Sequence, residues 1–269
     1  MIQLPDVALS AIAADGLRSL QAVVDAAGDY PARVAEGKRL FEARNRRGNA
    51  IFDEVKRALD RMCSGARRCA YCEDSAADEV EHVRPKDLYP EVVFAWANYV
   101  YACGPCNGPK GAHFAVFPAN GGEILEVSRA PRSLALPPSD GEPVLIDPRT
   151  DDATRFMLLD LRDTFYLLPS AARGTRDHAR AEYTIKTLRL NARDVLPRAR
   201  RQAYEDYVGL LHRYRRERDD GAGEPRLRQL SAGLRARQHP TVWREMLRCR
   251  DRLPELRTLF ADLPEAADW

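Results

Sequence analysis

The chain has 269 residues, enough for about one or two domains with a buried core. With 45% apolar and 30% charged residues and no apolar run long enough to cross a membrane, it is predicted to be globular and neither membrane-spanning nor secreted. The 42 Lys and Arg against 40 Asp and Glu leave a formal net charge of +2, which excludes a strongly basic coat. Any surface for a polyanion must therefore come from local charge placement.

The first 66 residues are predicted to be helical. Asn49 is a candidate N-cap for a helix over Ala50–Met62, whose apolar residues form one stripe and which Gly65 can end. An earlier helix is predicted over Asp15–Ala27 from the same apolar spacing. Several arginines gather around these helices, and they form a solvated face, a docking surface for a partner, or part of a groove for a polyanion. They are Arg44, Arg46, Arg47, Arg67 and Arg68.

The middle of the chain changes in composition. Residues 67–114 are rich in Cys, Trp, Tyr, Asn and Pro and contain a short β-type run at Asn98–Ala102. The stretch from Phe117 to Pro143 is predicted to form loops and a short hairpin, because Gly, Pro and Ser recur in it. Strands are predicted at Val144–Ile146 and Phe165–Leu168.

From Thr175 to the end the pattern is helical. Between Arg193 and Arg218 there are eight Arg against four acids, which fits a phosphate-facing strip, a docking surface for a partner, or a solvated flank with i,i+4 ion pairs. A break is predicted at Gly221–Gly223, followed by helices around Arg226–Gln238 and Thr241–Arg252.

Four of the six cysteines form two C-x-x-C pairs that are separated by 30 residues. The pairs are Cys69 with Cys72 and Cys103 with Cys106. This spacing predicts a tetrathiolate zinc site in a reducing, cytoplasmic compartment. The alternatives are structural cysteines with chance spacing and a redox C-x-x-C enzyme, although a thioredoxin-like βαβ pattern is absent from the sequence.

The residues between and beside these pairs carry a possible second site. Four sulfur ligands leave zinc no open position, so zinc is predicted to be structural and a catalytic ion would have to be a second one. The Glu81 carboxylate suits a hard ion such as Mg²⁺, and the neighbouring His82 imidazole suits proton abstraction from water. Asn107 follows Cys106 directly, where Gly108-Pro109 indicates the start of a helix, so its amide oxygen can complete the metal site.

A longer string of motifs runs through this segment. It reads Glu81-His82-x-x-Pro85-Lys86, then Trp96-x-Asn98, then Cys103-x-x-Cys106-Asn107-x-x-Lys110. Residues 69–110 thereby resemble the HNH endonucleases of the ββα-metal type, in the variant braced by four zinc-bound cysteines. The resemblance implies an α+β fold: a zinc-braced core over residues 67–120, a helical segment over 1–66, and a region over 121–269 with loops and short strands before its helices.

The resemblance also implies roles for individual residues. Glu81 and Asn107 would hold the catalytic Mg²⁺ or Mn²⁺, His82 would be the general base, and Asn98 would orient the loop that carries it. Lys110 lies one helical turn after Asn107, so its ammonium is expected to face the same cleft and bind a phosphate oxygen.

Two stretches further along extend the resemblance to residues 67–200. They are Leu145-Ile146-Asp147-Pro148-Arg149 and Thr187-Leu188-Arg189-Leu190-Asn191. Together with the motif string they are similar to the HNH subunits of bacterial anti-phage systems of the Septu and retron-associated types. This implies cleavage of double-stranded DNA and a partner ATPase or reverse transcriptase. The alternative is a zinc-stabilised nucleic-acid-binding or scaffold module without catalysis, which would have no use for the acid, imidazole and amide together.

Overall fold

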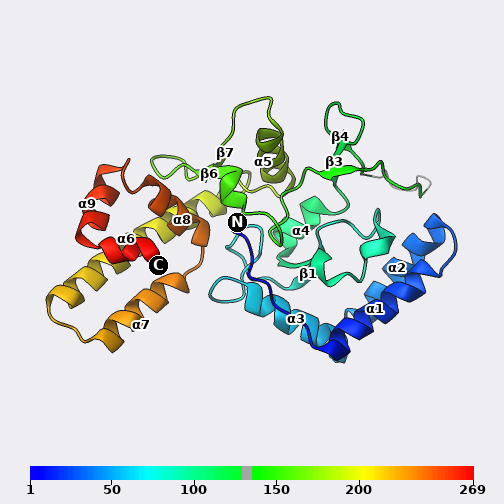
Figure 1. The fold of residues 1–269 in the computed structure, drawn as a ribbon, viewed down its shortest axis with the longest axis horizontal. Helices are drawn as coiled ribbons and strands as arrows, with labels where there is room; N and C mark the ends of the chain where they lie inside the picture. Colours follow the sequence, from blue (N-terminus) through cyan, green and yellow to red (C-terminus); the bar gives the residue numbers. More distant parts are fainter. Residues whose placement is uncertain (129–134) are drawn as a thin grey trace.

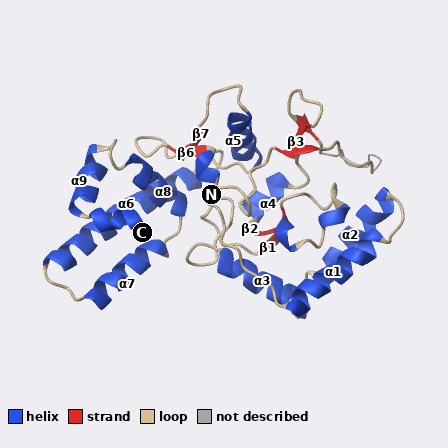
Figure 2. Ribbon diagram, viewed as in Figure 1, coloured by secondary structure: helices blue, strands red, loops and turns tan. Residues whose placement is uncertain are grey.

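The structure, a computed structural model, describes residues 1–128 and 135–269 (Figure 1). Helices dominate it, and the strands of the described residues form three small antiparallel sheets, so the fold is a mixture of helix and sheet as predicted (Figure 2). Part of the predicted loop region before Pro143, residues 129–134, lies outside the described residues. Throughout residues 1–128 and 135–269, every helix is too short or too polar to cross a membrane.

Three helices make up the N-terminal part of the chain. They are α1 (Ala11–Asp25), α2 (Tyr30–Arg44) and α3 (Ala50–Met62). The prediction for α3 is confirmed, including its cap, because the Asn49 side-chain oxygen accepts the Phe52 N–H at 3.2 Å. The predicted first helix begins earlier than expected, since Ser10 caps it and accepts the Ala13 N–H.

The N-terminal helices pack against the first sheet. Gly16 lets α1 approach α3, because a Cβ at this position would lie only 2.3 Å from the Ile51 side chain. A buried aromatic group then joins α2 and α3 to the sheet, with the rings of Phe41 and Phe52 5.6 Å apart and Tyr99 6.2 Å from Phe41. This core holds one face of the sheet in a fixed place.

The first sheet and the helix after it form a ββα unit. Strand β1 (Glu79–His82) pairs antiparallel with β2 (Tyr99–Ala102), with Glu79 opposite Ala102 and His82 opposite Tyr99. Helix α4 (Gly104–Lys110) follows β2 at once. Because side chains alternate along a strand, Glu79 and Glu81 share one face of β1, while His82 turns toward the aromatic core.

The predicted helix start at Gly108-Pro109 is wrong. Helix α4 begins at Gly104, and Pro105 takes the place in the first turn where proline needs no hydrogen-bonded N–H. Pro109 lies in the last turn instead, where its missing N–H removes one helical hydrogen bond. Asn107 therefore lies in the middle of the helix, one turn before Lys110.

Two further sheets follow, each with strands of only two to four residues. Strand β3 (Ala115–Pro118) pairs with β4 (Leu125–Glu126) and with β5 (Gly141–Pro143), and β6 (Met157–Leu159) pairs with β7 (Leu167–Pro169). The strands predicted at Val144–Ile146 and Phe165–Leu168 are thus displaced. Val144–Ile146 is buried extended chain in which Ile146 N–H bonds to the Thr184 hydroxyl at 3.0 Å, outside any ladder.

The C-terminal part is helical, as predicted from Thr175 onward. Its helices are α5 (Arg176–Thr187), α6 (Val195–Asp219), α7 (Glu224–Arg235), α8 (Pro240–Cys249) and α9 (Pro254–Asp262). The break predicted at Gly221–Gly223 is confirmed. Short 3-10 turns lie at Pro90–Val92, Trp96–Asn98, Ala153–Arg155 and Pro264–Asp268.

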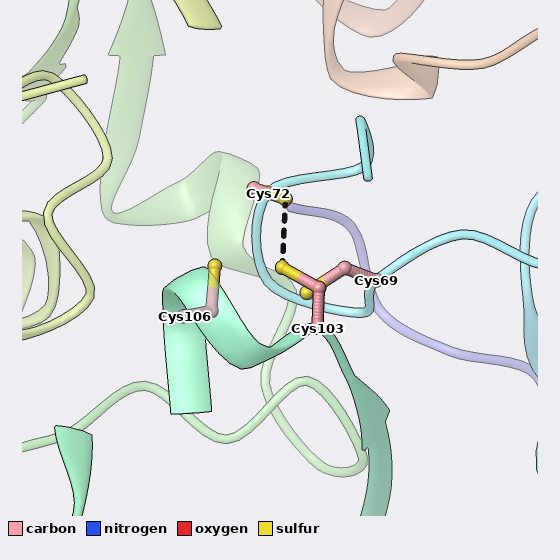
Figure 3. A group of neighbouring side chains, drawn as sticks. All are labelled: Cys69, Cys72, Cys103 and Cys106. Atoms are coloured by element: carbon pink, nitrogen blue, oxygen red, sulfur yellow. Dashed lines mark hydrogen bonds between the residues drawn. The ribbon is translucent and has the colours of Figure 1, made fainter. Parts of the chain in front are cut away.

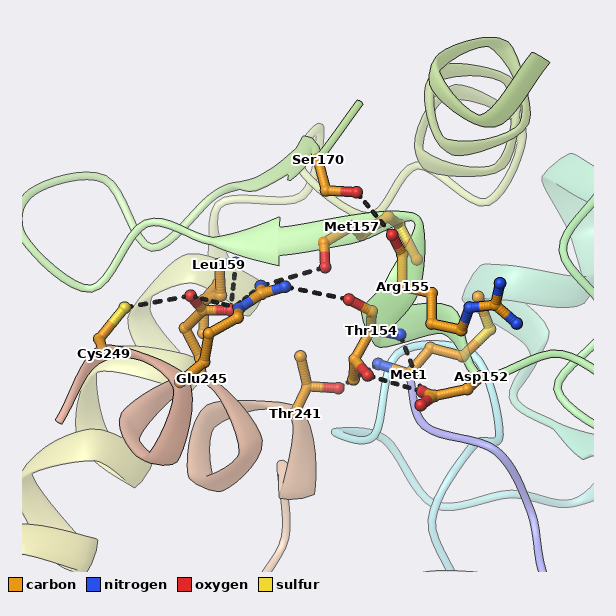
Figure 4. A network of polar contacts seen from close by, with 11 residues as sticks. Met1, Asp152, Thr154, Arg155, Met157, Leu159, Ser170, Thr241, Glu245 and Cys249 are labelled. Carbon is orange, nitrogen blue, oxygen red and sulfur yellow. Dashed lines mark hydrogen bonds and ion pairs between the residues drawn. The ribbon is translucent and has the colours of Figure 1, made fainter. Parts of the chain in front are cut away.

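Helix α8 is fixed to β6 by a polar network (Figure 4). The buried Glu245 carboxylate accepts the Leu159 N–H at 3.1 Å and pairs with Arg248, whose guanidinium also donates to the Met157 carbonyl at 3.2 Å. Since a buried carboxylate is stable only when its hydrogen bonds are satisfied, this network sets the position of α8 against the sheet.

Candidate metal centre and active site

The four cysteines of the two C-x-x-C pairs meet at one point (Figure 3). Their sulfur atoms all lie within 4.8 Å of one another, and the Cys72 and Cys103 sulfurs are 3.8 Å apart. A tetrahedral zinc ion with Zn–S bonds of about 2.3 Å requires sulfur spacings of about 3.8 Å. All four are free thiols with at most 2% of their surface exposed, so the donors and the geometry fit a structural zinc ion.

Backbone hydrogen bonds fix the conformation of both C-x-x-C segments. Cys69 and Cys72 lie in a turn before β1, where the Glu73 N–H bonds to the Cys69 carbonyl at 2.9 Å. Cys103 directly follows β2 and is the N-cap of α4, and Cys106 lies in the first turn of that helix, with its N–H bonded to the Cys103 carbonyl at 3.0 Å. A zinc ion here would therefore tie both strands and the helix of the ββα unit together.

Arg193 is a contact of this cluster that the sequence analysis missed. Its guanidinium donates to the Cys106 sulfur at 3.1 Å from the segment between α5 and α6. Four thiolates around Zn²⁺ carry an excess of negative charge, and a cationic donor to one sulfur reduces it. The sequence offers only its place in an arginine-rich stretch, which gives no sign of a partner 87 residues away.

Replacing Arg193 by alanine is expected to weaken zinc binding by about tenfold, because outer-shell donors typically contribute that much to metal affinity. Competition with a zinc chelator measures this loss. The control is Arg198→Ala, which removes an exposed arginine paired with Asp194 at the N-cap of α6, one turn earlier. Equal zinc retention in both variants would contradict a role for the sulfur contact.

Glu81 and Lys110 form a buried ion pair. The Lys110 ammonium lies 2.5 Å from the Glu81 carboxylate and donates to the His82 carbonyl at 2.8 Å. Lys110 is fully buried, which differs from the expectation that its ammonium faces the cleft. The Lys110 ammonium instead balances the charge of the Glu81 carboxylate and holds the end of β1 against α4.

His82 lies at the end of β1 with 2% of its surface exposed. Its Nε2 is 3.0 Å from the Val93 carbonyl, which can only accept, so Nε2 carries the proton and Nδ1 the lone pair. The ring packs edge-on against Phe41 at 4.5 Å between centroids. Burial, assisted by the Lys86 ammonium, lowers the pKa of His82 to about 3, so the imidazole is neutral at physiological pH.

Asn107 is oriented by a second carboxylate on β1. Its side-chain nitrogen donates to Glu79, and because an ionised carboxylate only accepts hydrogen bonds, the amide oxygen of Asn107 faces away from Glu79. That oxygen is then the free donor atom for a hard cation. The sequence analysis missed Glu79, although its i,i+2 spacing from Glu81 on a strand could have indicated it.

A cleft of about 540 Å³ brings most of these groups together. Glu81, His82 and Asn107 all line it, and so does Glu79. Glu81 and His82 are the last two residues of β1, and both side chains reach the cleft from that strand end. Asn98 and Lys110 are not among its lining residues.

Asn98 fastens the loop that follows His82. Its oxygen accepts the Arg84 N–H at 2.7 Å, and its nitrogen donates to the carbonyls of Arg84 and Val92, each at 3.0 Å. One side chain thereby joins the two ends of the segment between β1 and the 3-10 turn at Trp96–Asn98. The loop that places the Val93 carbonyl against His82 is held by these bonds.

Replacement of Asn98 by alanine is expected to lower the free energy of unfolding by about 2–3 kcal/mol, since it leaves three partly buried backbone groups without their partner. Denaturant titration measures the change. Asn191→Ala is a matched control, because Asn191 likewise holds backbone groups, those of Leu167, but outside this loop. We expect only Asn98→Ala to alter proteolytic cleavage between residues 84 and 92, and equal protection in both variants would contradict this role.

The arginine-rich stretch at 193–218 is mostly engaged within the protein. Arg200 is buried and donates to the Leu190 carbonyl at 2.8 Å, so it is not a surface residue. Arg213 pairs with Glu217 on the next turn, and Arg218 pairs with Glu265. These contacts favour the interpretation as a structural and solvated flank over a phosphate-facing strip.

Comparison with known proteins gives a partial likeness. No protein-family model matches the chain. A region of it is similar to a Septu protein. That protein is the Septu protein PtuB of Bacillus thuringiensis, to which the chain is 37% identical over 87 residues, or 30% of this chain and 33% of that protein. The matched region thus spans about a third of the length of the relative.

Proposed function

We propose that the protein is a metal-dependent HNH endonuclease that hydrolyses DNA phosphodiester bonds as the effector of an anti-phage defence system. The observation that carries the proposal is the shared cleft, in which an acid, a neutral imidazole and an amide lie beside a four-cysteine cluster. Metal-assisted hydrolysis of a phosphodiester needs ligands for a cation, a base for water and a scaffold that holds both. The acid and the amide would be the ligands, the imidazole would be the base, and the four-cysteine cluster would brace the scaffold.

Each residue has a defined part in this proposal. Glu81 and the oxygen of Asn107 would hold Mg²⁺ or Mn²⁺, which supplies positive charge to the phosphate when bound. The Nδ1 atom of His82 would take the proton from the attacking water, because its Nε2 is fixed on the Val93 carbonyl. Lys110 would hold the Glu81 carboxylate in place through their ion pair, and Asn98 would hold the loop around His82 in place.

The defence role rests on the likeness to the Septu protein. By analogy with that family, the expected partner is an ATPase or a reverse transcriptase, and the expected substrate is double-stranded DNA. The isolated chain would then await activation by its partner. The role is therefore best tested with the proteins encoded beside it.

The experiment is a cleavage assay on plasmid DNA with the purified complex of this chain and its neighbouring gene products. We expect cutting in Mg²⁺ or Mn²⁺ and none after both ions are removed while zinc stays bound. Absence of cutting by the zinc-loaded complex, with DNA binding retained, would contradict the nuclease. That result would favour the zinc-stabilised binding module instead.

A further inference from the structure

Helices α2 and α3 provide part of the wall of the cleft. Phe41 lies near the end of α2, Asn45 caps that helix, and Lys56 lies on α3, and all three line the cleft with β1 and α4. None of them belongs to the motif string between residues 69 and 110. A polymer that enters the cleft would therefore contact the N-terminal helices as well as the ββα unit.

The cleft has an unfavourable charge for a polyanion. Four of its lining residues are acidic: Asp78, Glu79, Glu81 and Asp87. Asp87 pairs with Lys38 at 2.5 Å and Glu81 with Lys110 at 2.5 Å, which leaves the charge of the other two carboxylates in the cleft. The cation of the proposed function would offset this field for the phosphate next to His82, but a strand that continues along the cleft needs further positive charge on the cleft wall.

Lys56 is in a position to supply that charge. It is half-buried in the cleft and, among residues 1–128 and 135–269, it forms no ion pair. The other lysine of the lining, Lys86, has its ammonium 5.4 Å from the centre of the Phe41 ring. Exposed arginines flank the lining residue Asn45 along the chain, namely Arg44, Arg46 and Arg47, and Arg46 also donates to the Glu42 carbonyl.

We propose that the α2–α3 wall, defined as Lys56 together with the three exposed arginines that flank Asn45, binds backbone phosphates of a nucleic-acid strand that lies in the cleft. Lys56 would contact a phosphate inside the cleft, and the arginines would follow the strand outward. The inference rests on the proposed function for the identity of the ligand. It adds that the N-terminal helices form part of the groove.

The test measures binding of a short fluorescent DNA duplex in Mg²⁺ at several salt concentrations, in a His82→Ala background that prevents cutting. Lys56→Ala is expected to weaken binding about tenfold and to reduce the slope of log affinity against log salt by about 1. Lys56→Arg should restore both, because it keeps the charge. Arg57→Ala is the matched control: it removes an exposed cation next to Lys56 that does not line the cleft.

The outcomes separate this inference from the proposed function. If the parent binds DNA and Lys56→Ala binds with the same affinity and salt slope, phosphate binding by the α2–α3 wall is overturned and the nuclease proposal stands. If Lys56→Arg fails to restore binding although it melts at the parent's temperature, the phosphate contact is likewise overturned. If the parent binds no DNA and the wild-type complex cuts none, both proposals fall together.

Discussion

Replacement of His82 by alanine is expected to slow DNA cleavage by about 10²–10⁴-fold, the usual contribution of a general base. The physical reason is the lone pair on Nδ1, which the hydrogen bond from Nε2 to Val93 fixes in a neutral, oriented imidazole. The measurement is the single-turnover rate of plasmid cutting by the activated complex. Zinc content, measured by elemental analysis, is expected to stay at about one ion per chain.

The control for this variant is another histidine. His113 is exposed, has its Nδ1 3.6 Å from the Glu126 carboxylate and lies outside the cleft lining, so His113→Ala should cut at the wild-type rate. Because His82 also packs against Phe41 and Tyr99, His82→Asn serves as a second variant that leaves a smaller cavity. Cutting by both His82 variants at the wild-type rate would remove His82 from the mechanism.

Replacement of Cys103 by serine is expected to release zinc and to lower the free energy of unfolding by more than about 3 kcal/mol. Cys103 joins β2 to α4, and its sulfur lies 3.8 Å from that of Cys72, so its loss opens the cluster that ties the ββα unit together. Elemental analysis and thermal unfolding measure the two effects. Cleavage should also fall below detection, since Asn107 lies in α4 beside the cluster.

Cys63→Ser is the matched control. Cys63 is half-buried at the end of α3, and its thiol contacts the Leu59 carbonyl, away from the four-cysteine cluster. This variant should keep its zinc and its stability within about 1 kcal/mol. Full zinc occupancy in Cys103→Ser, or equal melting temperatures of the two variants, would contradict a structural zinc site.

The sequence predicted those features that local rules decide. The C-x-x-C spacing marks two tight local arrangements, a turn before β1 and the start of α4 directly after β2, and Asn49 caps α3 because a short polar side chain satisfies the first free N–H groups. The helical C-terminal part and its break at Gly221–Gly223 also follow from local propensity.

The prediction that was wrong and the contacts that the sequence analysis missed all depend on tertiary packing. Helical spacing put Lys110 one turn from Asn107, but spacing does not say which side of the turn faces solvent, and the ammonium is buried against Glu81. Arg193 contacts Cys106 of the four-cysteine cluster from 87 residues further along the chain. Lys56 lines the cleft from α3, outside the ββα unit. No periodicity in the sequence encodes contacts at such separations.

The central claim is that Glu81 and Asn107 hold a catalytic cation next to His82, in a unit braced by zinc. The most direct measurement is a crystal structure of the His82→Ala protein with DNA and Mn²⁺, with anomalous scattering recorded at the zinc and manganese edges. We predict zinc among the four sulfurs and manganese in the cleft on the Glu81 carboxylate and the Asn107 oxygen. Manganese bound elsewhere, or a Glu81 carboxylate that stays on Lys110 with no cation beside it while DNA fills the cleft, would contradict the account.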